Sequence, residues 1–286
     1  MSPDHFREEA RRFARRDRWT AGRIYFEEAV RLRPTFADAR AYLGFFCVKE
    51  SRFDTARGLA EFSAALELDP TCAAAYVYRA ITLGSLLRRA EADAALAAAE
   101  KFGAPPADLA LARGSVELEA GSVEKAVVHF QALVELEKDA TSLLLLAQAH
   151  LQAGRREEAL SCARQAFAAE PDDFRAPVYG AIALAYLERF EEARAELNRA
   201  SELDADYALL HHTRAYVALK TCSLKEAEEH ARACLRCDPH YVTSRKLLAD
   251  LCAASGRVEE ARAHYQTALL LFPDYTEARE ALQRLS

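Results

Sequence analysis

The feature that most constrains the fold is a repeat with a period of 34 residues. Pro239 and Pro273 are 34 positions apart, and Pro171 precedes Pro239 by 68 positions, or twice that interval. A repeat of this length corresponds to one supersecondary unit, which can bury its apolar face only by stacking against its neighbours. The equivalent positions in the other units, after small changes of repeat length, are Pro34, Pro70, Ala104, Lys138 and Ala205.

Small residues recur at fixed places within each period. The first half carries pairs such as Leu43-Gly44 and Leu248-Ala249, and the second half carries the triplet Glu-Glu-Ala ending at Ala159, Ala193 and Ala261. Ala, Leu, Glu and Arg dominate the composition, and all four favour helix. Glycines between the two halves and prolines after the second predict two antiparallel helices per unit. The small residues would allow these helices to approach closely where they cross.

This pattern resembles the tetratricopeptide repeat, in which a Leu-Gly pair, a later Ala and a Pro recur every 34 residues. The resemblance implies an all-α, right-handed superhelical solenoid of about eight antiparallel helix pairs. Ala278, Ala281, Leu282 and Leu285 share one face of a final segment, which predicts a capping helix over 276–286 and an array that is complete. The predicted repeats of this single domain, 1–286, span approximately 3–36, 37–72, 73–106, 107–139, 140–173, 174–207, 208–241 and 242–275.

Charge and composition exclude several classes of function. The net charge of −6 argues against a nucleic-acid partner, which would favour a strongly basic surface. No apolar run approaches the length of a membrane helix, and we expect no signal peptide, because the residues after Met1 lack a basic end followed by an apolar stretch. The seven cysteines form no compact framework, so we interpret them as reduced thiols and expect a cytoplasmic protein.

The first forty residues depart from the overall charge, because they hold ten arginines against seven acids. Arg7, Arg11 and Arg15 belong to this basic end. One interpretation is a solvated helix face. The other is a basic entrance to a binding site.

No constellation of residues predicts catalysis, a metal site or a cofactor. Cys234 and Cys237 form a CxxC pair, but they occupy small or apolar positions of the repeat, as core cysteines do. His211 and His212 are adjacent, and adjacent helical residues point about 100° apart, which does not favour chelation of one metal. The Glu-Glu pairs recur at the start of the second helices, where they suit the helix dipole. We therefore expect a non-enzymatic protein.

The resemblance also implies where a partner binds, because first helices line the concave face in that family. The positions that point inward there give an apolar groove with charged ends. Its predicted residues are Phe45, Val48, Val77, Ile81, Leu111, Leu118, Leu144, Gln148, Leu151, Val178, Ile182, Tyr186 and Tyr216.

The single asparagine, Asn198, lies in a second helix. The clamps and ladders that other members of the family build from asparagine are therefore not expected, and an apolar helical or extended segment suits the groove better. The function predicted is a scaffold that binds a partner polypeptide in this groove. The alternative is an assembly or regulatory module that binds through the basic first repeat or the convex face, including by self-association.

Overall fold

The structure is a computed structural model, and it describes residues 3–14, 18–50 and 54–285. All regular secondary structure in these ranges is helical, as predicted. The chain forms two compact units, residues 1–155 and residues 156–286, each of which is described by itself. Within the described ranges, no helix combines the length and the apolar character that a membrane crossing requires.

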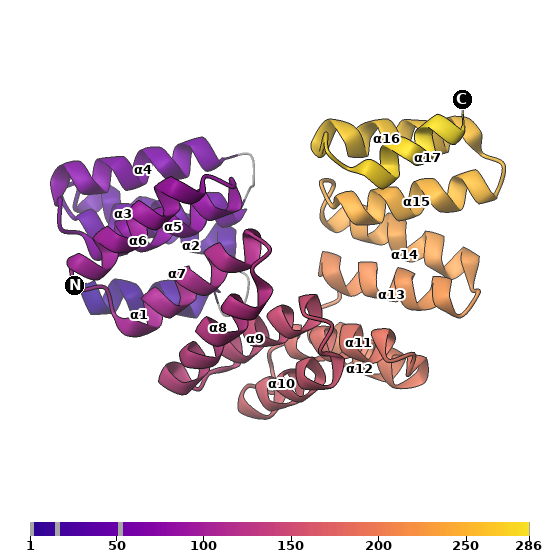
Figure 1. Cartoon of the computed structure of the whole chain (residues 1–286), viewed down its shortest axis with the longest axis horizontal. Helices are drawn as coiled ribbons and strands as arrows, with labels where there is room; N and C mark the ends of the chain where they lie inside the picture. The colour runs from indigo at the N-terminus through magenta and orange to yellow at the C-terminus, as the bar shows by residue number, and fades with distance from the viewer. Residues whose placement is uncertain (1–2, 15–17, 51–53, 286) are drawn as a thin grey trace. The chain divides into compact units, whose positions relative to one another are not determined.

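Unit 1 is a stack of antiparallel helix pairs, seen in indigo to magenta in Figure 1. Its core is aromatic, because Phe6, Phe26, Phe46 and Phe62 are all buried. The rings of Phe26 and Phe46 stack with their centroids 5.4 Å apart, so that the second helix is held against the third. The helices are α1 Pro3–Ala14, α2 Trp19–Leu32, α3 Ala37–Glu50, α4 Thr55–Leu68, α5 Ala73–Ser85, α6 Arg89–Lys101, α7 Pro106–Glu119, α8 Val123–Glu137 and α9 Ala140–Gln152.

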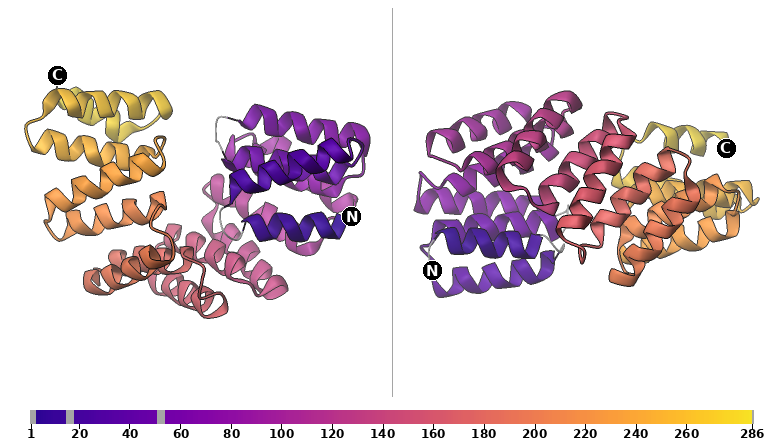
Figure 2. Two further views of the ribbon diagram at one scale, coloured as in Figure 1. Left: turned by 180° about the vertical axis from the view of Figure 1, so that it is seen from behind. Right: turned by 90° about the horizontal axis from the view of Figure 1, so that it is seen from below.

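Unit 2 has the same construction, and the final helix packs on α16 at its C-terminal end (Figure 2). Leucines and alanines replace the phenylalanines in its core, with Leu184, Leu197, Leu210 and Leu248 fully buried. The helices are α10 Arg156–Ala169, α11 Arg175–Tyr186, α12 Phe190–Leu203, α13 Ala208–Lys220, α14 Leu224–Cys237, α15 Val242–Ala254, α16 Val258–Leu271 and α17 Thr276–Arg284.

Small residues allow neighbouring helices, within a pair or between successive pairs, to cross closely, although not to the same degree everywhere. A Cβ atom added to Gly44 would lie 2.6 Å from the ring of Phe62 and 2.9 Å from the carbonyl oxygen of Gly58. A Cβ added to Gly180 would meet nothing nearer than Ala163, at 3.8 Å. Gly44 is therefore required by the approach of α4, whereas Gly180 leaves room for a methyl group.

Several of the described turns within the helix pairs contain a residue with a left-handed backbone conformation. Gly121, Gly154 and Gly256 have φ between +73° and +76°, which glycine adopts without steric cost. At the corresponding turns, Leu87 and Glu188 have φ of +58° and +60°. The backbone conformation is thus set by the turn, whatever residue occupies it.

The predicted repeat boundaries, the number of repeats and the right-handed superhelix stay predictions. The boundary between the two units falls after Arg155, inside the predicted repeat 140–173. The predicted capping segment forms α17, and its Ala278 is fully buried.

Candidate protein-interaction surface

In unit 2, two predicted groove residues form an accessible aromatic pair. Tyr186, at the end of α11, is 44% exposed, and its ring centroid lies 5.7 Å from that of the half-buried Tyr216 on α13. The guanidinium of Arg156 lies over Tyr186 at 5.9 Å, and the ammonium of Lys220 lies over Tyr216 at 5.5 Å. Half-buried Ile182 lies one turn before Tyr186. We call these five residues the tyrosine face.

The cations of the tyrosine face have no acidic partner in the described part of the chain. Neither Arg156 nor Lys220 makes an ion pair there, although most arginines of this protein do. A cation over an aromatic ring is stabilised by the ring's quadrupole and still carries its full charge. The face therefore offers both apolar contact area and uncompensated positive charge.

Unit 1 has a second aromatic cluster around the predicted residue Phe45. The ring of Phe45 lies 4.5 Å from that of Tyr78 and 6.1 Å from that of Trp19. The ammonium of Lys49 lies about 6 Å from both Trp19 and Phe45. The sequence pattern gave no reason to select Trp19, because it begins a second helix.

Several other predicted groove residues belong to the interior. Val77, Leu118, Leu144 and Val178 are buried, so their side chains are part of the core of their units and present no surface. Half-buried Val48 packs toward α4, because a Cβ added to Gly58 would clash with its methyl group. A predicted position on a first helix thus does not by itself give an accessible side chain.

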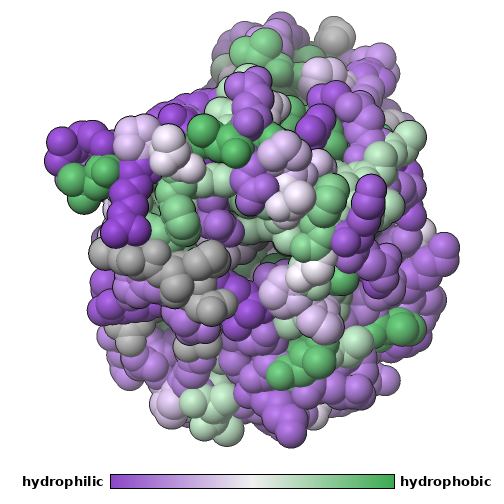
Figure 3. Space-filling view, turned by 90° about the vertical axis from the view of Figure 1, so that its left-hand side faces the viewer, coloured by the Kyte–Doolittle hydropathy of each residue, from purple (hydrophilic) through white to green (hydrophobic). Residues whose placement is uncertain are grey.

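The remaining predicted residues are half-buried. They are Ile81, Leu111, Gln148 and Leu151, all in unit 1. Figure 3 shows one side of the molecule, where apolar residues form separate patches among hydrophilic ones.

The basic end is paired within unit 1. Arg7 donates a hydrogen bond of 2.9 Å to Asp108 at the start of α7, and Arg11 donates two of 2.7 Å to Glu137 at the end of α8. Arg15 lies outside the described residues. Nothing in the local sequence indicates these pairs, because the partners are 101 and 126 positions apart. Arg7 and Arg11 therefore do not form a free basic surface in this structure.

In the CxxC pair, the first cysteine lies in the core and the second lies on the surface. Cys234 is buried, which raises its pKa to about 12, and Cys237 is exposed. A thiol with such a pKa holds its proton at neutral pH and is a poor nucleophile.

The adjacent histidines His211 and His212 make different contacts. His212 and Ser244 share a hydrogen bond of 2.7 Å, whereas the ring of His211 stacks on the ring of His230. The adjacent histidines thus have separate partners.

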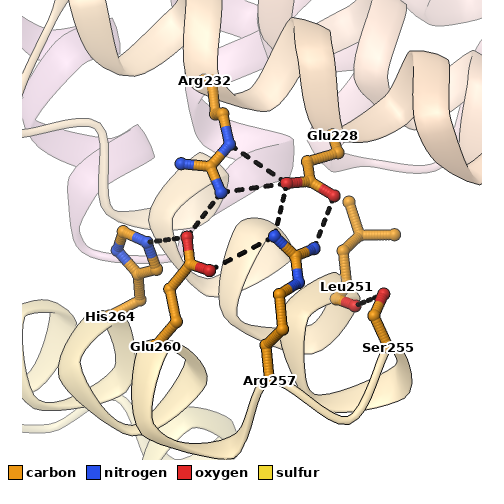
Figure 4. Close-up of polar contacts among 7 residues, drawn as sticks. All are labelled: Glu228, Arg232, Leu251, Ser255, Arg257, Glu260 and His264. Atoms are coloured by element: carbon orange, nitrogen blue, oxygen red, sulfur yellow. Dashed lines mark hydrogen bonds and ion pairs between the residues drawn. The ribbon is translucent and has the colours of Figure 1, made fainter.

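One group of side chains has the composition of a metal site. The ligand atoms of Cys252, Glu260 and His264 lie within 4.8 Å of one another. The carboxylate of Glu260, however, already accepts hydrogen bonds from Arg232 and Arg257, which also bind Glu228 (Figure 4). Two guanidinium groups beside the site would oppose a divalent cation, so we interpret the group as part of an ion-pair network between α14 and α16.

Comparison with known proteins relates the chain to helical-repeat proteins. Among solved structures, a tetratricopeptide repeat protein from Parabacteroides merdae matches 91% of this chain and 98% of its own at 15% identity, with a TM-score of 0.67. The thermophilic tetratricopeptide repeat protein TTC0263 of Thermus thermophilus matches 63% of this chain and 98% of its own at 24% identity, with a TM-score of 0.58.

A larger assembly also contains this fold. The Cut9–Hcn1 hetero-tetramer of the APC/C matches 92% of this chain and 52% of the solved chain at 16% identity, with a TM-score of 0.69. No curated protein sequence matches the chain. Residues 144–208 and residues 218–285 each match a sequence profile described as tetratricopeptide repeat. Residues 144–208 and 218–285 are thus identified as tetratricopeptide repeats, and the chain shares its fold with solved tetratricopeptide repeat proteins.

Proposed function

We propose that this protein is a non-enzymatic protein–protein interaction scaffold and that it binds a segment of its partner on the tyrosine face of unit 2. The family supports the general role. The particular surface is proposed because Tyr186 and Tyr216 are accessible on two neighbouring first helices and each lies under an unpaired cation.

The chemistry of the tyrosine face indicates what it would bind. Tyrosine offers a large, rigid contact area at low cost in side-chain entropy, and it is enriched at binding hot spots. Arg156 and Lys220 would attract carboxylates at the two ends of the face. The partner we propose is an apolar or aromatic segment with acidic residues beside it.

The alternative function, binding through the basic first repeat, has less support. Arg7 and Arg11 would first have to leave Asp108 and Glu137. Breaking these ion pairs opposes binding, because any new partner must replace hydrogen bonds that the folded chain already makes.

The experiment is a quantitative capture of partners from lysate of the source organism. The full chain would be compared with a Tyr186→Asp/Tyr216→Asp variant and with Leu270→Asp as a control. Leu270 is 81% exposed on a second helix of the same unit, so the control adds the same charge elsewhere. Partners identified by mass spectrometry would then be titrated individually.

The expected result is a loss of affinity of about tenfold or more for the double tyrosine variant, with no loss for Leu270→Asp. Equal binding by all three proteins, after thermal melting shows that they are equally folded, would refute the tyrosine face as the binding surface.

A further inference from the structure

A polar pocket lies in unit 2 on the other side of α13 from the tyrosine face. Its volume is about 250 Å³, and residues of α12, α13 and α14 line it. Arg214, on α13, is two residues from Tyr216, which places the two side chains about 200° apart around the helix. The lining residues are Arg194, Leu197, Asn198, Arg214, Val217, Glu226 and His230.

Arg214 occupies a position that holds a leucine in three of the predicted repeats. The equivalent residues Leu43, Leu146 and Leu248 are all buried. Arg214 donates hydrogen bonds of 3.2 Å to the carbonyl oxygen of Leu197 and to the side-chain oxygen of Asn198. No carboxylate of the described residues forms an ion pair with it, and burial lowers its pKa. Its guanidinium is therefore held in place by neutral oxygens, without a direct ion pair.

Another arginine at the same repeat position shows the contrast. Arg113 in unit 1 pairs with Glu100 at 2.7 Å. A guanidinium paired in this way has a carboxylate that compensates its charge. Arg214 instead has neutral oxygens as its hydrogen-bond acceptors, and it lines the pocket.

Arg194 contributes a second guanidinium with an unused donor. It donates hydrogen bonds of 2.9 Å to Thr221 and 3.4 Å to Glu226, but its buried Nε has no partner in the structure. A buried N–H without an acceptor costs free energy, and such a group is commonly satisfied by water or a ligand. Glu226 is the only carboxylate in the lining, so the two arginines exceed it by one positive charge.

One imidazole belongs to the lining of the pocket, and a second lies against it. The ring of His230, which lines the pocket, stacks on that of His211 with centroids 5.8 Å apart. The buried Nδ1 of His211 also has no hydrogen-bond partner in the structure. Burial lowers the pKa of both histidines, so both are neutral near pH 7 and able to donate or accept a hydrogen bond.

We propose that this pocket is an oxyanion-binding site for a phosphate or carboxylate group. The planar guanidinium groups of Arg194 and Arg214 suit the paired oxygens of such a group, and the excess positive charge attracts it. Asn198 and the carbonyl oxygen of Leu197 hold Arg214 in place for this role. Glu226 lies on the same wall and repels an anion, so it sets a limit to the affinity.

The test uses the full chain and two simple probes. Inorganic phosphate and acetate would be titrated separately at pH 7 and constant ionic strength, and binding would be followed by calorimetry and by the side-chain Nε–H signals of arginine in NMR. Arg214→Leu introduces the residue that three other repeats have at this position, so it is expected to fold. Arg113→Leu is the matched control, and Glu226→Gln removes the opposing charge.

Saturable binding of either probe, weakened about tenfold or more by Arg214→Leu, unchanged by Arg113→Leu and tightened by Glu226→Gln, would support the proposal. Binding of phosphate alone or of acetate alone would identify the source of the oxyanion. The absence of saturable binding to both probes, or equal binding by the wild type and Arg214→Leu, would overturn it. Substitutions on the tyrosine face leave this readout unchanged, so the two proposals can fail separately.

Discussion

Arg11 and Glu137 are 126 positions apart in the sequence, and their side chains are joined by two hydrogen bonds of 2.7 Å. The pair connects the first helix of unit 1 to the end of α8. Arg7 and Asp108 form a second connection of the same kind beside it. The first helix is therefore held not only by its neighbours α2 and α3 but also by charges from the fourth predicted repeat.

This pair should contribute measurably to the stability of unit 1. We expect Arg11→Ala and Glu137→Ala each to lower the free energy of unfolding by about 1 kcal/mol, since the geometry is bidentate and both side chains are mostly buried. A double-mutant cycle by urea denaturation measures the coupling. The exchanged pair Arg11→Glu/Glu137→Arg should recover part of the loss. A coupling energy of zero would show that the two side chains do not interact in solution.

The two helix-crossing glycines should respond oppositely to alanine. Gly44→Ala forces a Cβ against the carbonyl oxygen of Gly58 and the ring of Phe62, and we expect a loss of about 1–3 kcal/mol. Gly180→Ala meets only ordinary contacts, and we expect a gain of about 0.5–1 kcal/mol from helix propensity. Thermal and urea unfolding of both variants provide the comparison. Equal destabilisation would mean that α10 and α11 cross as closely as α3 and α4.

The left-handed turn at Leu87 offers a stabilising substitution. Leu87 has φ of +58° and is 72% exposed, so it carries the steric cost of that conformation without contributing to the core. Leu87→Gly should raise the free energy of unfolding by about 1 kcal/mol. Leu87→Ala is the control, because it shortens the side chain but keeps the Cβ. A gain of the same size from alanine would attribute the effect to the exposed leucine and not to the backbone.

The network around Glu228 predicts a dependence of stability on pH. Hydrogen bonds from Arg257 and then Arg232 lower the pKa of Glu228 from its ordinary value of 4.5 to about 2. A carboxylate with a depressed pKa stabilises the fold above the unfolded value, and this contribution is lost as the pH falls from about 4.5 to about 2. Because the site is partly solvated, we expect only about 1 kcal/mol.

Denaturation of the wild type and Glu228→Gln between pH 7 and pH 3 measures this contribution. The variant should be less stable at pH 7, and the difference should shrink as the pH is lowered. A difference that stays constant with pH would show that the ionised carboxylate is not what Arg257 and Arg232 stabilise.

The sequence predicted the helices well because their signals are local and periodic. Pairs such as Leu43-Gly44 and the turn glycines fix where each helix crosses and ends, and a family resemblance adds the stacking of the pairs. The solvent exposure of individual side chains could not be predicted from the sequence in the same way. Val77 and Val178 are buried while Tyr186 is exposed, since exposure depends on the sizes and tilts of neighbouring helices.

Contacts between distant repeats also could not be predicted from the sequence. The partners of Arg7 and Arg11 come from about one hundred positions away and follow no periodic rule. Arg214 did leave a signal, shared with Arg79 and Arg113, because arginine stands in these repeats where three others have leucine. That signal became interpretable only when the structure showed which atoms surround the guanidinium.

The proposed binding surface can be tested most directly by site-specific photo-crosslinking. A photoreactive phenylalanine analogue would replace Tyr216 in one protein and Leu270 in another, and both would be irradiated in lysate of the source organism. We predict a discrete crosslinked partner from position 216 that is absent from position 270. Crosslinks of equal yield from both positions, or a partner captured from position 270 alone, would contradict binding on the tyrosine face.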